Sequence, residues 1–145
     1  MAVKQISIFL ENRTGQLAEI TGLLASEKVN LRAISIAETA DYGLLRIIAD
    51  DSDKATSVLV KGGNIISVTP VTVVSVPDKP AGLFEVLNLL ADGNIGIEYM
   101  YSLFTHQNEK AYMVFRVVDE DYNKFINLIE SHGLQTAKAE ELGLK

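Results

Sequence analysis

The feature that most constrains the fold of this chain is an internal repeat. When the 145-residue sequence is shifted by 66 positions, many residues of the first half fall on equivalent residues of the second. Beyond the middle of each copy the best shift becomes 70, because four residues are added around T-H-Q-N-E-K, where a loop accepts an insertion at little cost. Matched residues in matched order indicate a duplicated unit. The identical pairs include Leu17 and Leu83, Glu19 and Glu85, Leu24 and Leu90, Ala25 and Ala91, Arg46 and Arg116, Lys54 and Lys124, and Gly63 and Gly133.

Each copy has the hydrophobic pattern of four strands and two helices. In the first copy, alternating or continuous apolar runs predict strands, and apolar residues at a spacing of three to four predict a helix that ends near Lys28. The acidic stretch D-D-S-D suits the cap of a second helix, which the Gly62–Gly63 pair ends. The expected order is strand, helix, strand, strand, helix, strand. The predicted strands cover residues 3–10, 31–37, 44–49 and 65–68.

This order predicts an α+β fold of two ferredoxin-like repeats, each an antiparallel sheet with two helices on one face. We assign the repeats to residues 1–69 and 70–145. Pro70 lies at their junction and has no N–H to donate to a strand ladder, so it predicts a turn there rather than one continuous strand. The uncovered face of each sheet and the apolar content of 48% predict that another repeat or a second chain covers part of this surface.

Composition excludes several classes of function. The absence of cysteine excludes disulfides, thiolate catalysis and cysteine-ligated metals, and no apolar run approaches the length of a membrane-spanning helix. We therefore expect a cytoplasmic protein without a membrane association. A net charge of −6 with no basic cluster argues against direct binding of nucleic acid, and the ribonucleoprotein motif of RNA-binding sheets is absent.

Two short turns stand between a strand and a helix at equivalent places in the copies. The first reads N-R-T-G-Q-L, Asn12 to Leu17, and the second D-K-P-A-G-L, Asp78 to Leu83. A helix start presents unpaired N–H groups and a partial positive charge, which suit a carboxylate. Gly15 allows close approach of a ligand, and an Asn or Asp oxygen suits an ammonium group. The same residues also suit a purely structural helix start, with Asn12 and Asp78 as caps.

These residues resemble the ACT domain, a small module that senses amino acids and regulates the proteins that carry it. Its mark is an [N/D]-[R/K]-P-G-x-L turn after the first strand, followed by a helix and a [V/I]-N-[I/L] start of the second strand. Here the second strand begins with V-N-L in the first copy and I-G-I in the second. The chain departs from the family pattern at Thr14, at Ala81 with Gly82 one place later, and at Gly96.

The resemblance implies a free-standing tandem ACT protein without catalytic activity or cofactor. It implies a small amino acid as ligand at an interface between repeats or subunits, a homodimer, and a partner enzyme or transcription regulator that responds. The ligand-binding residues carried over by motif are Asn12, Arg13, Thr14, Gly15, Gln16, Leu17, Asn30, Leu31, Asp78, Lys79, Pro80, Ala81, Gly82 and Leu83.

Two other functions remain open from the sequence. A ligand-independent adaptor or regulatory subunit would keep the fold and carry degenerate turns. A small ferredoxin-like enzyme would need a convergent set of ionisable residues, which no motif supplies.

Several residue groups have simpler explanations. D-D-S-D lacks the spacing of a calcium loop and predicts a cap, and neither His106 nor His132 has a second ligand at metal-binding spacing. Glu19 and Glu85 lie off the apolar helix face and are expected in solvent. Arg46 and Arg116 are expected to pair with nearby carboxylates such as Asp50 or Asp119. A further group of residues is expected in the core or at an interface, namely Tyr99, Met100, Tyr101, Tyr112 and Met113.

Overall fold

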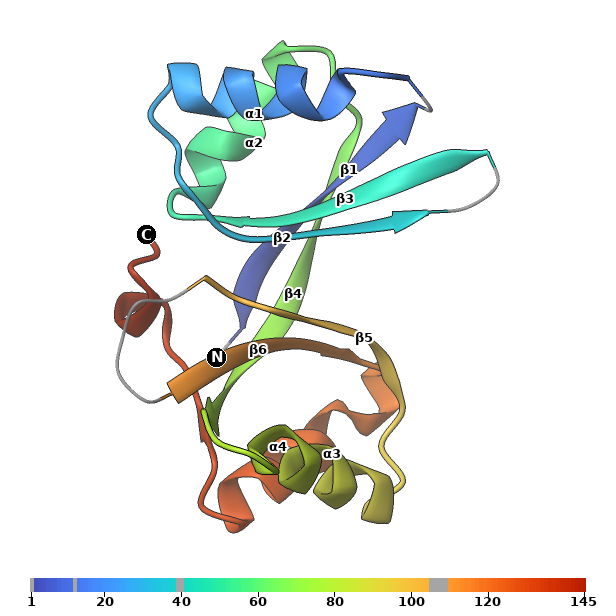
Figure 1. Cartoon of the computed structure of the whole chain (residues 1–145), viewed down its shortest axis with the longest axis vertical. Helices are drawn as coiled ribbons and strands as arrows, with labels where there is room; N and C mark the ends of the chain where they lie inside the picture. Colours follow the sequence, from blue (N-terminus) through green and yellow to red (C-terminus); the bar gives the residue numbers. More distant parts are fainter. Residues whose placement is uncertain (1, 12, 39–40, 105–109) are drawn as a thin grey trace. The chain divides into compact units, whose positions relative to one another are not determined.

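The computed structural model describes residues 2–11, 13–38, 41–104 and 110–145 (Figure 1). The observed order of strands and helices is the predicted one in both copies. The first copy comprises β1 (Val3–Glu11), α1 (Gln16–Ser26), β2 (Leu31–Glu38), β3 (Tyr42–Ala49), α2 (Ser52–Lys61) and the start of β4 (Ile66–Pro77). The second continues from β4 through α3 (Gly82–Asp92), β5 (Ile97–Ser102), β6 (Lys110–Val117), the short helix η1 (Asp119–Asp121), α4 (Tyr122–Ser131) and β7 (Gln135–Thr136), and a further short helix η2 (Ala139–Leu142) follows.

The strand order is the same in the two copies. In the first, the hydrogen-bonded neighbours run β4-β1-β3-β2, and in the second they run β7-β4-β6-β5. The pairs β1–β3, β2–β3, β4–β6, β4–β7 and β5–β6 are antiparallel. The fold is therefore α+β with two βαββαβ units, and the predicted fold class is confirmed.

The predicted turn at Pro70 is wrong, because β4 is one strand of 12 residues from Ile66 to Pro77. Pairing of β4 with β6 begins at Thr72, so the missing N–H of Pro70 costs that ladder no hydrogen bond. The strand serves as the fourth strand of the first copy and the first strand of the second. One compact unit comprises Lys4–Pro70 with Ala139–Lys145, and the other comprises Val71–Lys138 with the amino-terminal residues up to Val3.

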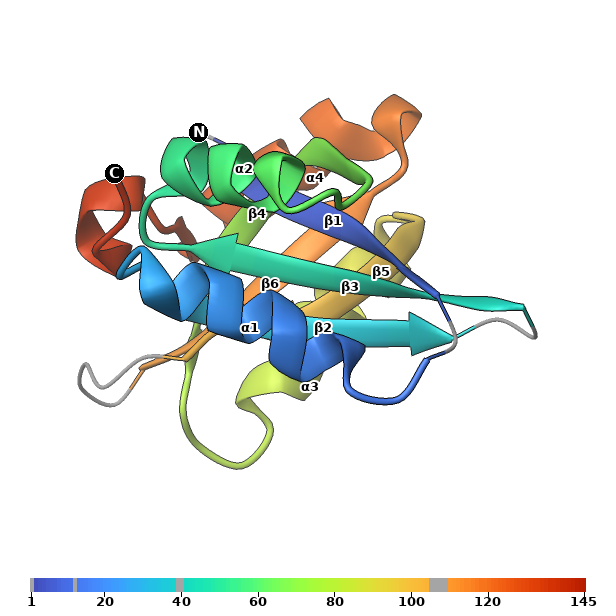
Figure 2. The same ribbon diagram turned by 90° about the horizontal axis from the view of Figure 1, so that it is seen from above.

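The core of the first copy lies between its sheet and its two helices. Alternate residues of β1 point to the helices, which lie together on the same face of the sheet (Figure 2). Side chains alternate across a strand, so Ile6, Ile8 and Leu10, which are two positions apart in β1, lie on this same face. The core includes Ile6, Ile8 and Leu10 of β1, Ile20 and Leu24 of α1, Leu45 and Ile47 of β3, and Ala55 and Leu59 of α2.

The second copy repeats this arrangement with larger side chains. Phe115 of β6 and Phe125 of α4 are fully buried, with ring centroids 5.8 Å apart. Met100 and Met113 pack against the same core, and Tyr101 and Tyr112 are buried. The expectation of a core or interface role is confirmed for Tyr101 and Tyr112 by their burial and for the half-buried Met100 and Met113 by their packing against the core. Tyr99 is also half-buried and stacks on Tyr101, with ring centroids 6.4 Å apart.

Short-range polar contacts fix the ends of the elements. The Asp51 carboxylate accepts a hydrogen bond from the Lys54 N–H at 3.1 Å and caps α2, as predicted from D-D-S-D. Arg116 pairs with Asp119 at 3.0 Å. The Asp50 carboxylate accepts from the Asn30 N–H at 3.0 Å, which ties the start of β2 to the end of β3. Among the described residues no helix is long and apolar enough to span a membrane.

Candidate functional site

The turn between β1 and α1 is held by its own backbone. The Arg13 N–H donates to the Glu11 carbonyl at 2.7 Å, and the Gln16 N–H donates to the Arg13 carbonyl at 3.4 Å. Gly15 is the N-cap of α1 and has φ of 87°, in the left-handed region that favours glycine. The Gln16 N–H is used within the turn, but glycine has no side chain to cap the N–H groups that follow it, so this helix start remains suited to an anionic group. Asn12 lies outside the described residues.

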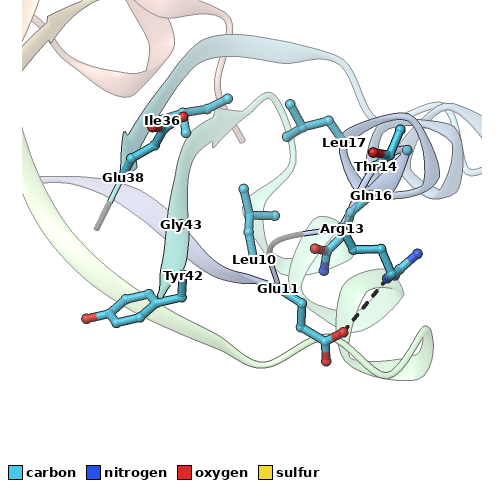
Figure 3. A pocket seen from close by; sticks show the side chains of 11 residues that line it. Leu10, Glu11, Arg13, Thr14, Gln16, Leu17, Ile36, Glu38, Tyr42 and Gly43 are labelled. Carbon is cyan, nitrogen blue, oxygen red and sulfur yellow. Dashed lines mark ion pairs between the residues drawn. The ribbon is translucent and has the colours of Figure 1, made fainter. Parts of the chain in front are cut away.

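A cavity of about 500 Å³ opens at this turn. Its size falls within the range of about 300–1,000 Å³ that is usual for sites that bind small molecules. Figure 3 shows α1 on one side of the cavity and the ends of β1, β2 and β3 around the rest. The lining residues are Leu10, Glu11, Arg13, Thr14, Gly15, Gln16, Leu17, Ile36, Glu38, Tyr42 and Gly43.

The cation at the turn is already engaged. The two terminal nitrogens of Arg13 contact the two carboxylate oxygens of Glu19 at 2.8 and 2.9 Å. A carboxylate oxygen of Glu11 lies 3.8 Å from Nε of Arg13, the ion pair drawn as a dashed line in Figure 3. The hydrogen bonds with Glu19, and then its charge, raise the pKa of Arg13, and Arg13 likewise lowers the pKa of Glu19. Glu19 and Glu85 are both exposed, as expected for solvent-facing residues.

Three side chains of the lining, those of Glu11, Glu38 and Gln16, carry acceptor oxygens. The exposed carboxylates of Glu11 and Glu38 stand at the mouth of the cavity. Gln16 is only 8% exposed, and its Oε1 has no hydrogen-bond partner among the described residues. A buried acceptor without a donor costs about 1–3 kcal/mol, so Oε1 marks a place for a donor group.

The predicted site residues of the first copy divide into two groups. Arg13, Thr14, Gly15, Gln16 and Leu17 lie together in the lining of the cavity. The other two residues, Asn30 and Leu31, are not in the lining: the Asn30 N–H is bound to Asp50, and Leu31 packs against the core.

The second turn has the same backbone. The Lys79 N–H donates to the Pro77 carbonyl and the Gly82 N–H to the Lys79 carbonyl, both at 3.0 Å. Ala81, with φ of 69°, takes the left-handed place of Gly15. The glycine that appeared displaced in the motif therefore stands in the place of Gln16, where a Cβ would overlap the Pro77 carbonyl oxygen. The predicted residues Asp78 and Pro80 belong to this turn, and Leu83 follows it in α3.

Sequence reasoning missed six residues of the lining. Glu11 is the last residue of β1 and directly precedes the turn, so its place near the site could have been predicted from the sequence. Leu10 also lies on β1, and the other four lie on the neighbouring strands β2 and β3, where the register pairs Leu10 with Gly43 and Glu11 with Tyr42. Finding these required the strand order β1-β3-β2, which a single turn motif does not give. The missed residues are Leu10, Glu11, Ile36, Glu38, Tyr42 and Gly43.

Comparison with known proteins places this geometry in a family. The model of the ACT domain pair matches residues 1–143. The chain belongs to the ACT domain pair family. Its structure is similar to that of protein BT0572 from Bacteroides thetaiotaomicron, with a TM-score of 0.87 and 40% sequence identity over 99% of this chain and 96% of that chain. A comparison with curated protein sequences finds no match.

A more distant similarity concerns the fold alone. The regulatory subunit of aspartate kinase from Thermus thermophilus, in its ligand-free form, has a TM-score of 0.63 and 16% identity over 90% of this chain and 92% of that chain. The subunit from Thermus flavus has a TM-score of 0.60 and 14% identity over 88% and 90%. The fold of the present chain is thus similar to that of these two subunits. Among the described residues, no group of three or more acidic or histidine side chains is placed to hold a metal ion.

Proposed function

We propose that this ACT pair is a non-enzymatic regulatory protein that binds a small amino acid at the first turn and signals to a partner protein. The observation that carries the proposal is the cavity of about 500 Å³ at the start of α1, whose lining contains five of the residues carried over by motif. In sequence, we assign its two repeats to residues 1–69 and 70–145.

The cavity offers complementary groups for a zwitterion. The first turn of α1 presents N–H groups and the positive end of the helix dipole, which favour a carboxylate. The carboxylates of Glu11 and Glu38 stand at the mouth of the same cavity and favour an ammonium group. Leu10, Leu17 and Ile36 provide apolar surface for a side chain.

The cavity is open, which favours a second ACT unit as its cover. Leu17, Ile36 and Tyr42 line it and remain 38%, 45% and 42% exposed. Clustered apolar side chains at the mouth of a cavity favour an interface. We propose that another ACT unit, from this chain or a second copy in a homodimer, closes the site.

Signalling then follows from linkage. A ligand that bridges two units stabilises the arrangement that holds it, and a partner that binds this arrangement is regulated by the same free energy. The Thermus thermophilus relative is a regulatory subunit of aspartate kinase. By analogy, the partner of this chain is an enzyme or a transcription regulator of the cytoplasm.

The thermal midpoint of the full chain against all twenty amino acids tests this function. A ligand at about 100 times its dissociation constant adds about 2.7 kcal/mol to the free energy of unfolding, which raises the midpoint by several degrees. We expect one or a few chemically related amino acids to produce this shift. A midpoint unchanged by all twenty would contradict sensing and favour the ligand-independent adaptor.

A matched pair of variants locates the effect. Leu17 and Leu83 occupy equivalent positions in α1 and α3 and are both 38% exposed, but only Leu17 lines the cavity. Leu17→Ala should reduce the ligand-induced shift, and Leu83→Ala should leave it unchanged. An equal loss in both variants would contradict a site at the first turn.

A further inference from the structure

The two turns differ in the one side chain that follows their left-handed residue. In the first copy this residue is Gln16, which is buried in the cavity lining with its Oε1 lacking a partner among the described residues. In the second copy it is Gly82, and the Pro77 carbonyl occupies the space that a side chain would need. The second turn therefore has no counterpart of this acceptor and no room for one.

The charges beside the two turns also make the first turn the better place for an ammonium group. Glu11 pairs across the sheet with Tyr42, whereas the equivalent pair in the second copy is Pro77 and Lys110. The carboxylate that favours an ammonium group in the first copy is thus replaced by proline beside a cation. The second turn keeps the backbone of the first and lacks counterparts of the acceptors at Gln16 and Glu11.

The acceptor at Gln16 also restricts the ligand. Its amide lies toward Leu10 in the cavity, away from solvent (Figure 3). An uncharged donor satisfies a buried amide oxygen without the cost of burying a charge. Glu11 and Glu38 repel an acidic side chain, and the two short contacts of Arg13 are made with Glu19, whereas its Nε lies 3.8 Å from Glu11.

We infer that each chain binds one ligand, at the first turn, and that this ligand is an α-amino acid whose side chain donates an uncharged hydrogen bond, from a hydroxyl or a carboxamide, to Oε1 of Gln16. This inference rests on the proposed function and specifies its ligand class and its stoichiometry.

Isothermal titration of the full chain with pairs of amino acids of similar shape tests the ligand class. The pairs are L-threonine with L-valine, L-asparagine with L-aspartate, and L-glutamine with L-glutamate. We expect the preferred amino acid to be the donor-bearing member of one pair, to bind at least about tenfold more tightly than its counterpart, and to saturate at one per chain. Preference for an apolar or acidic member, or saturation at two per chain, overturns the inference.

The variant Gln16→Met separates recognition from structure, because methionine has a similar length and no strong acceptor. The variant should bind the preferred amino acid at least about tenfold more weakly and lose the discrimination within the pair. Without ligand its thermal midpoint should equal or exceed that of the wild type, since an unsatisfied acceptor has been removed. A lower midpoint, or retained discrimination, overturns the role of Gln16.

The failures of the two proposals differ in their results. A wild-type chain that binds none of the twenty amino acids overturns the proposed function, and this inference with it. A chain that binds an amino acid without a donor side chain leaves the proposed function in place and overturns only the inference.

Discussion

The left-handed residues at the two helix starts allow a reciprocal test of the turn. Gly15 has φ of 87° and Ala81 has φ of 69°, with ψ of −4° at both. A Cβ added to Gly15 would meet no atom within 4 Å, so only the backbone conformation opposes the substitution. The left-handed conformation costs a residue with a Cβ about 1–2 kcal/mol, and the reduced freedom of the unfolded chain returns about 0.4–1 kcal/mol.

Gly15→Ala should therefore lower the free energy of unfolding by about 1 kcal/mol, and Ala81→Gly should raise it by about the same amount. Urea unfolding followed by circular dichroism measures both, provided that the slope against urea concentration stays constant. The double variant should return close to the wild type, because the two sites lie in different compact units and the effects of independent sites add. Stabilisation by Gly15→Ala, or destabilisation by Ala81→Gly, would refute the left-handed assignment.

Two further predictions concern polar contacts. Asp51→Ala should lower the free energy of unfolding by about 1 kcal/mol, because α2 loses its cap, and Asp53→Ala, an exposed carboxylate of the same helix, should change it by less than about 0.5 kcal/mol in urea unfolding. Glu19 should titrate at lower pH in the wild type than in Arg13→Ala, when followed by NMR of its side-chain carboxyl carbon, because Arg13 stabilises the carboxylate. The contribution of the Glu19–Arg13 pair to stability is present above the ordinary pKa of glutamate and is lost as the pH falls through the lowered pKa of Glu19. Titration of Glu19 at the same pH in both chains would contradict the pair.

The sequence was sufficient for features that depend on nearby residues. The period of the apolar residues predicted the helices, the cap at Asp51 followed from D-D-S-D, and the duplication predicted the order of elements. The turn at Pro70 was mispredicted because the cost of a proline in a strand depends on whether its N–H faces a ladder, which is a property of the sheet. Tyr42 and Gly43 entered the site through strand register, which joins residues about thirty positions apart.

The second turn shows why a motif predicts a helix start more reliably than a binding site. In the second motif the glycine, Gly82, stands one position later than Gly15 does in the first. The left-handed backbone position is nevertheless the same in both turns, and Ala81 occupies it in the second. The backbone hydrogen bonds of the turn are alike in both copies. They therefore explain why a helix starts at each turn, but they do not distinguish a turn that binds a ligand from one that does not. What differs is the next residue and the strand beside it. If one copy alone binds, the determinant of binding is the acceptor at Gln16 together with the carboxylate at Glu11, and replacing these two changes the function of the turn without changing its fold.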